Sequence, residues 1–315
     1  MLDKNRNING MDIEQQKYIG NTVAGLAGGT AVFAWLPNKL QKPVSKLNMR
    51  SCSNFTIREQ HEIWDAAKKT LENMPIKDNV QFIDITERNW EPVADNIVEK
   101  RRVFLKNNKN PFIKLISKTW PNDARYKEMF RVYAEGKNAC FMPATSQLLV
   151  NRDKMGSAAF HELGHAMNAK GIGEGRILAK IRGKAKNCVP LVFLISMLTP
   201  KDREDSKTKN PVYKTLLNFK KYAGLIAALC MLPMVAEEGL ASIKGSKMAK
   251  KVLSPELCKR INKVNTRSFM SYTTGMILVG IGMALANYVK DKVTGPLPAK
   301  KKTNETPKNQ ELIAK

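Results

Sequence analysis

The apolar residues of this chain gather into four runs: Tyr18–Leu36, Cys188–Leu198, Tyr222–Ala236 and Tyr272–Val289. A water-soluble enzyme usually spreads them along amphipathic elements instead. A helix rises about 1.5 Å per residue, so only the first and last runs approach the roughly 30 Å of a bilayer core. We expect Tyr272–Val289 to be the best full-length span. The two short runs are expected to pair as a hairpin that is buried or dips into one leaflet.

The first apolar run is rich in glycine, with Gly25 and Gly29 in a G-x-x-x-G arrangement. This composition leaves two interpretations open: a membrane helix, or a buried helix that packs its small face against a neighbour. No small-x-small cleavage site follows the run, so we expect a retained anchor and not a cleaved signal peptide.

Amphipathic patterns between the first two runs predict a smaller mixed region. A capping box at Thr56–Glu59 predicts a helix to about Met74. The further elements expected are a strand at Val80–Ile85, a helix at Glu91–Lys106, extended segments at Met129–Ala134, Asn138–Met142 and Gln147–Asn151, and helices at Met155–Lys170 (closed by Gly171) and Lys244–Arg267. The predicted fold class is therefore mainly α with a small antiparallel β-sheet (α+β).

The chain is strongly basic, with 53 Lys and Arg against 28 Asp and Glu and a net charge of +25. Such a balance suits nucleic acid, anionic lipid or simply a solvated surface. The lysines form no stripe, and no nucleic-acid-binding motif accompanies them. We favour membrane lipid and expect no nucleic-acid partner. The five cysteines include no C-x-x-C pair and predict reduced thiols.

Two of the chain's three histidines belong to the sequence His161-Glu162-Leu163-Gly164-His165. On a helix, residues four apart share a face, so both imidazoles can hold one Zn²⁺. Glu162 lies on a neighbouring face, where it reaches a metal-bound water as general base without binding the metal. H-E-x-x-H rarely arises by chance and predicts a zinc hydrolase. Two ordinary surface histidines are the weaker alternative.

Zinc requires a third protein ligand and an open fourth position. His61 lies between Gln60 and Glu62 on an amphipathic helix, so we interpret it as a surface residue. Glu237 and Glu238 directly follow an apolar helix, and one of them can project toward a metal. We expect Glu238 to be the ligand and keep Glu237 as the alternative.

These motifs resemble the HtpX-like membrane metallopeptidases, which include the CAAX prenyl endopeptidases. Asn138–Pro143 is similar to the family's N-A-F-x-x-P turn, and Gln147–Asn151 to the strand that follows it. The H-E-x-x-H helix comes next, then two apolar runs. Glu238–Ser242 resembles the family's E-x-x-A-D motif except at its last position. The resemblance covers about residues 129–251.

The resemblance implies a zincin-like catalytic core with membrane-associated apolar helices, His161, His165 and Glu238 as zinc ligands, and a protein or peptide substrate. It also implies that the substrate lies extended along an edge strand, here Leu148, Leu149 and Val150. An ordinary sheet strand is the alternative. The location implied is a membrane, expected to be the bacterial inner membrane with the catalytic face in the cytoplasm.

On this basis we divide the chain into a polar segment with a candidate membrane helix (1–37), a catalytic domain (38–187), an apolar helical hairpin (188–236), the glutamate-ligand region (237–271), a candidate transmembrane helix (272–289) and a basic disordered tail (290–315). The predicted function is a membrane-associated zinc metalloendopeptidase. Ser242 departs from the family pattern, because it stands where an aspartate would orient a zinc histidine. It keeps open a catalytically silent, zinc-binding membrane scaffold.

Overall fold

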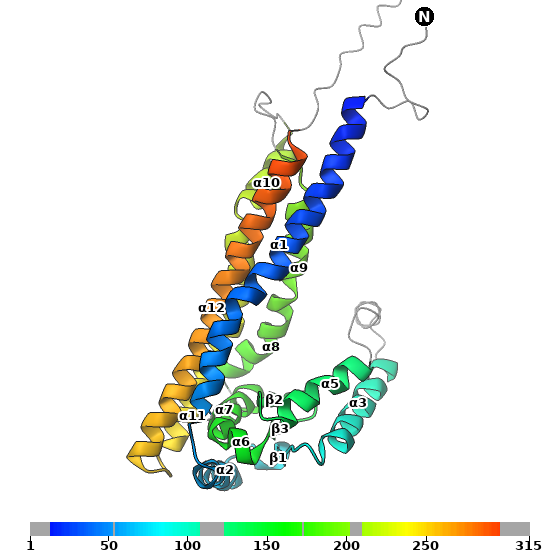
Figure 1. The fold of residues 1–315 in the computed structure, drawn as a ribbon. Helices are drawn as coiled ribbons and strands as arrows, with labels where there is room; N and C mark the ends of the chain where they lie inside the picture. Colours follow the sequence, from blue (N-terminus) through cyan, green and yellow to red (C-terminus); the bar gives the residue numbers. More distant parts are fainter. Residues whose placement is uncertain (1–12, 53, 108–122, 172, 202–209, 297–315) are drawn as a thin grey trace, which may run out of the picture.

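The computed structural model describes residues 13–52, 54–107, 123–171, 173–201 and 210–296. A bundle of long helices stands on a smaller lobe (Figure 1). The bundle consists of α1 (Ile13–Cys52), α8 (Glu174–Lys186), α9 (Cys188–Leu198), α10 (Pro211–Lys221), α11 (Ala223–Ala249) and α12 (Pro255–Thr294). The lobe consists of α2 (Ile57–Glu72), β1 (Gln81–Asp84), α3 (Trp90–Asn107), α5 (Asp123–Ala134), β2 (Cys140–Met142), β3 (Gln147–Val150), α6 (Arg152–Met155) and α7 (Ala159–Lys170).

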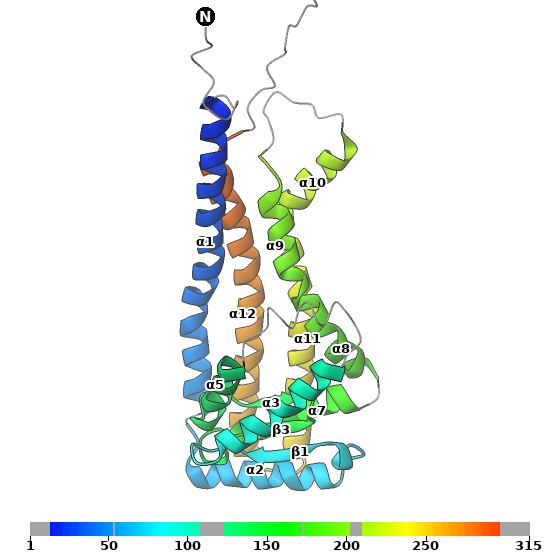
Figure 2. The ribbon, with the colours of Figure 1, turned by 90° about the vertical axis from the view of Figure 1, so that its right-hand side faces the viewer.

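Helices α1 and α12 lie side by side and antiparallel along most of their length (Figures 1 and 2). The glycines of the G-x-x-x-G arrangement make this close approach possible. A Cβ atom at Gly25 would lie 2.8 Å from the carbonyl oxygen of Lys290, and one at Gly29 would lie 2.7 Å from that of Ala286. The opposite face of α1 carries exposed apolar side chains such as Val23 and Trp35. The first apolar run therefore packs its small face against α12 and leaves several large side chains outside, while Phe33 stacks on Phe193 of α9.

Three helices are long and apolar enough to cross a membrane: residues Glu14–Leu47 of α1, α11 and α12. Most of their apolar side chains lie on the outside, including Leu225, Leu229 and Ile277, each more than half exposed. A soluble protein rarely exposes apolar surface on this scale, so the bundle is suited to association with a membrane. Tyr272–Val289 is part of α12, as expected.

The run Tyr222–Ala236 is longer in the structure than its sequence suggested. It belongs to α11, which continues through Pro233 and the two glutamates to Ala249. Helices α9 and α11 pack together with α10 at their far end, and α11 also contacts α7 (Figure 2). This confirms the expected pairing of the two apolar runs, but the close contacts with the H-E-x-x-H helix come from the part of α11 that follows the run, at Ala241 and Gly245.

The sheet is mixed and not purely antiparallel as expected. Its strand order is β1-β3-β2, with β1 parallel to β3 and β2 antiparallel to it. A parallel pair requires a long crossover, and the chain from Asp84 to Gln147 supplies one through α3 and α5. Strand β3 is therefore central, with a partner on each side, and its four residues are buried.

Two further expectations about secondary structure differ from the structure. Met129–Ala134 belongs to helix α5, because Phe130 and Ala134, four residues apart, are both buried on one face. Lys244–Arg267 is interrupted between α11 and α12, where Ser254 caps α12 and Pro255 occupies its first turn.

The segment boundaries expected at residues 37 and 271 fall inside the continuous helices α1 and α12. Helix α12 continues to Thr294, four residues past the expected start of the tail. The remainder of that tail, residues 297–315, lies outside the described residues, as do the polar residues 1–12. All five cysteines are free thiols, as the absence of a pairing pattern predicted.

Candidate metal centre

Helix α7 presents its H-E-x-x-H residues directly against α11. The two backbones approach closely through glycine. A Cβ atom at Gly164 would lie 2.2 Å from the carbonyl oxygen of Ala241, and one at Gly245 would lie 2.5 Å from that of Phe160. No larger residue fits at either position without moving a helix. This contact places the middle of α11 over the two histidines.

The side chains of His161, His165 and Glu238 converge on one point, as the sequence predicted. The two histidine Nε2 atoms lie 3.1 Å apart. Oε2 of Glu238 lies 3.3 Å from Nε2 of His161 and 3.2 Å from Nε2 of His165. All three residues are buried, with exposed fractions of 8% or less. They form the one group of His, Cys, Asp or Glu side chains arranged to hold a metal ion among the described residues.

The spacing of these three atoms fits zinc. Bonds of 2.0–2.2 Å in a tetrahedral arrangement separate neighbouring ligand atoms by roughly 3.3–3.5 Å. The observed separations are close to that value. In addition, no described donor makes a hydrogen bond to either carboxylate oxygen of Glu238, which is 1% exposed, and Arg182 lies 3.7 Å from its Oε1 as an ion-pair partner beyond hydrogen-bond distance. A buried carboxylate without hydrogen bonds is costly, and a bound cation removes that cost.

Glu237 contacts the other side of the His165 ring and lies outside the three-residue group. Nδ1 of His165 lies 2.9 Å from Oε1 of Glu237, so this nitrogen donates and Nε2 is free for a metal. Asn168 donates to the same oxygen at 2.9 Å, and Arg182 of α8 forms an ion pair with Oε2. Burial lowers the pKa of His165, but Glu237 and Glu238 outweigh it and raise the pKa to about 10, so a cation bound at Nε2 would take the place of the ring's second proton. The site thus attracts positive charge.

Ser242 performs a matching role for His161. Its hydroxyl oxygen lies 3.3 Å from Nδ1 of His161 and donates to the backbone oxygen of Asn265 at 3.4 Å. The serine at the position of the expected aspartate therefore still contacts the histidine. It offers a weaker, uncharged acceptor, but it fixes the same tautomer, with Nε2 of His161 toward Glu238.

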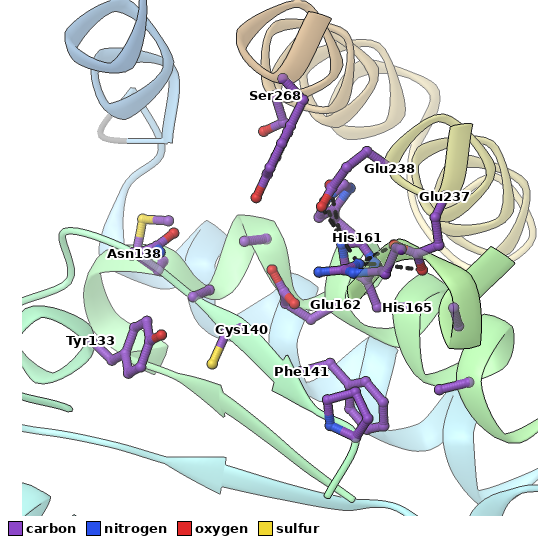
Figure 3. A pocket seen from close by; sticks show the side chains of 18 of the residues that line it. Tyr133, Asn138, Cys140, Phe141, His161, Glu162, His165, Glu237, Glu238 and Ser268 are labelled. Carbon is purple, nitrogen blue, oxygen red and sulfur yellow. Dashed lines mark hydrogen bonds and ion pairs between the residues drawn. The ribbon is translucent and has the colours of Figure 1, made fainter. Parts of the chain in front are cut away.

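Glu162 shares a cleft of about 430 Å³ with the three ligand residues. Figure 3 shows its carboxylate pointing into the cleft and away from the ion pairs of the two adjacent glutamates. The cleft is bounded by α7, by α8, by α12 and by the β2 region of the lobe. Tyr133 and Cys140 form its opposite wall, and burial raises the pKa of the Cys140 thiol to about 12, so the thiol is neutral.

The strand expected to bind the substrate, β3, does not line the cleft. Leu148, Leu149 and Val150 are fully buried in central strand β3 and have no free edge. The strand beside the cleft is β2, which pairs only with β3 among the described strands. The sequence indicated both strands, but an edge depends on the pairing order, which the sequence pattern does not give.

His61 lies apart from the cluster, as expected. Its Nε2 atom lies 2.6 Å from Oδ1 of Asp153 on the surface, and 36% of its side chain is exposed. The sequence did not single out Asn168 or Arg182. Both are polar residues close after the H-E-x-x-H motif, and only their position against Glu237 distinguishes them from surface residues.

Comparisons with protein-family models, with curated proteins and with solved structures find no match.

Proposed function

We propose that this chain is a membrane-associated zinc metalloendopeptidase with a zincin-like catalytic core. The observation that carries the proposal is the spacing of the Nε2 atoms of His161 and His165 and Oε2 of Glu238, at 3.1–3.3 Å from one another. These atoms face a cleft that also contains the carboxylate of Glu162, which belongs to neither the three-atom group nor its ion pairs. Three ligands, an open side and a nearby base are the arrangement of a catalytic zinc site.

Each residue has a distinct part in this proposal. A bound zinc ion supplies a Lewis acid that lowers the pKa of water toward 7. Glu162 accepts the proton of the attacking water and then passes it to the leaving amine. Glu237 and Ser242 hold the imidazoles of His165 and His161 in the tautomer that leaves both Nε2 atoms unprotonated toward the metal.

The free edge of β2 supports a peptide or protein substrate. An extended peptide can add to this edge through backbone hydrogen bonds and so lie across the cleft. Ala139, Cys140 and Phe141 line the cleft at that edge. In this arrangement the recognition of the main chain gives affinity, and the side chains of the cleft wall select the sequence. The proposal thus moves substrate binding from β3 to β2.

We also propose the bacterial inner membrane as the location, with the lobe in the cytoplasm. The support is the resemblance of the metal motifs to HtpX-like peptidases. The lysines of α10, at the end of the bundle remote from the lobe, weigh against this orientation under the positive-inside rule (Figure 1). A reporter fused after Thr294 decides the matter, because α12 places that residue at the α10 end. Reporter activity in the cytoplasm would place the α10 end there and the lobe on the opposite side of the membrane, contrary to this proposal.

The test of the activity compares wild type with Glu162→Gln. Glutamine keeps the shape of Glu162 but accepts no proton, so we expect cleavage of an unfolded protein to fall by about 10²–10⁴-fold while zinc per chain stays the same. Glu174→Gln, at an exposed position of α8 outside the cleft, is the matched control and keeps activity. Cleavage by wild type must also stop with a chelator and return with zinc.

Equal cleavage by wild type and Glu162→Gln overturns the mechanism. Zinc bound in both proteins without cleavage of several substrates by either one favours the silent scaffold. Ser242 was the feature in favour of that alternative, and its contact with His161 weakens the argument.

A further inference from the structure

A second groove lies between α11 and α12, on the far side of Ser242 from the catalytic cleft. It encloses about 520 Å³. Its lining consists of one face of each helix: Gly239, Ser242, Ile243, Ser246, Lys247 and Lys250 from α11, and Asn262, Asn265, Thr266 and Phe269 from α12. The proposed peptidase mechanism uses none of these residues except Ser242.

The two ends of the groove differ in character. Toward the apolar part of the bundle it is bordered by Ile243 and Phe269, both exposed, with exposed Met270 next to them. Toward the lobe it is bordered by the exposed side chains of Lys247 and Lys250. None of the described residues that line it is acidic. The groove therefore offers an apolar end and a cationic end about one to two helical turns apart.

The floor of the groove contains buried hydrogen-bond acceptors without donors. The Oδ1 atoms of Asn262 and Asn265 have no hydrogen-bond partner in the described part of the chain. Asn265 is 2% exposed, and its Nδ2 group donates to the hydroxyl of Ser246 at 2.9 Å, which fixes Oδ1 as the free atom. A buried acceptor of this kind requires a donor, and a bound hydroxyl group can supply it.

The position of the groove along the two helices matches the boundary between the hydrocarbon core and the head groups of a bilayer. On α11 the residues between Lys221 and Lys244 include no Lys or Arg, and on α12 the same holds between Arg267 and Lys290. Each interval contains 22 residues, and a bilayer core requires about 20. Lys244 and Arg267 bound these two intervals on the side of the lobe, and both residues lie level with the middle of the groove. Its apolar end thus lies within the hydrocarbon band and its lysines lie at the level of the head groups.

From these observations we propose that the groove binds the head group of an anionic phospholipid that also carries hydroxyl donors, as phosphatidylglycerol does. The lysines pair with the phosphate, the hydroxyls donate to the two free asparagine oxygens, and the acyl chains pass along Ile243 and Phe269. Phosphatidylcholine offers no hydroxyl donor and no net negative charge, so the groove discriminates against it.

The experiment titrates the delipidated full chain in detergent with phosphatidylglycerol or phosphatidylcholine and follows retained lipid by native mass spectrometry and Tm. The variant Lys247→Gln/Lys250→Gln is compared with Lys259→Gln/Lys263→Gln, which removes two exposed lysines of α12 outside the groove. We expect phosphatidylglycerol to bind and raise Tm in wild type and in the control. The groove variant should bind it roughly tenfold or more weakly.

Equal binding by the groove variant and the control, or equal binding of both lipids, overturns the proposal. Inorganic phosphate or glycerol phosphate alone is a further arm, and a Tm shift equal to that with lipid would assign the groove to a soluble phosphate ester instead. None of these measurements depends on zinc or cleavage, so the lipid site and the proposed peptidase activity fail or succeed separately.

Discussion

Glu237 and Glu238 hold opposite nitrogens of one imidazole ring. Oε1 of Glu237 lies 2.9 Å from Nδ1 of His165, and Oε2 of Glu238 lies 3.2 Å from its Nε2. Neighbouring residues on a helix point about 100° apart, and His165 fits between the two carboxylates. Glu238 therefore belongs to the group that could hold a metal ion, while Glu237 contacts the other nitrogen of the same ring.

The two glutamates should differ in their effect on zinc. Glu238→Ala removes a ligand, so we expect zinc per chain to fall close to zero after dialysis. Glu237→Ala removes only the acceptor for His165, and the loss of such a contact weakens metal affinity by about 10–100-fold. Elemental analysis measures zinc per chain, and competition with a chromogenic chelator measures the affinity for zinc. Loss of zinc from Glu237→Ala with full retention by Glu238→Ala would reverse the assignment.

Ser242→Ala should lower zinc affinity less than Glu237→Ala. It removes a neutral acceptor 3.3 Å from His161, in contrast to a charged one at 2.9 Å from His165. We expect roughly a tenfold loss, near the low end for such contacts. Ser246→Ala, one turn further along α11, is the control, because the Ser246 hydroxyl bonds to Asn265 and not to a histidine. A larger effect from Ser246→Ala would contradict the role of Ser242.

Gly164→Ala should disrupt the site although it changes no ligand. The new Cβ atom would lie 2.2 Å from the carbonyl oxygen of Ala241, so α7 must move away from α11. We expect a loss of about 1–3 kcal/mol in the free energy of unfolding, together with weaker zinc binding. Gly183→Ala is the matched control, because nothing lies within 4 Å of the added Cβ in α8. This control should be neutral or slightly stabilising, as alanine favours helix. Thermal unfolding without zinc measures the stability of each variant, and the change in Tm on adding zinc reports its zinc binding.

Alkylation should separate Cys140 from Cys188. Burial, reinforced by the negative charge of Glu162, raises the pKa of the Cys140 thiol to about 12. The reactive thiolate is therefore scarce below that pH and increases as the pH rises toward it. Cys188 is exposed. At neutral pH we expect iodoacetamide to modify Cys188 well before Cys140, as followed by peptide mass spectrometry. Faster modification of Cys140 would mean that the β2 edge opens readily.

The sequence by itself determined the local features of this protein. The four-residue spacing of His161 and His165 places both imidazoles on one helix face, whatever surrounds the helix. The apolar runs gave the long helices of the bundle, and the capping box at Thr56–Glu59 gave the start of α2, where both reciprocal hydrogen bonds are present. Each of these follows from contacts between residues close in the chain.

Only the tertiary structure decided which strand is an edge and which glutamate joins the two histidines. The parallel pairing of β1 with β3 joins residues more than 60 positions apart, so no local pattern encodes it. Glu237 and Glu238 are equivalent in sequence, and the choice between them depends on how α11 is rotated against α7. That rotation is fixed by the backbone contacts at Gly164 and Gly245, where any side chain would hold the helices apart.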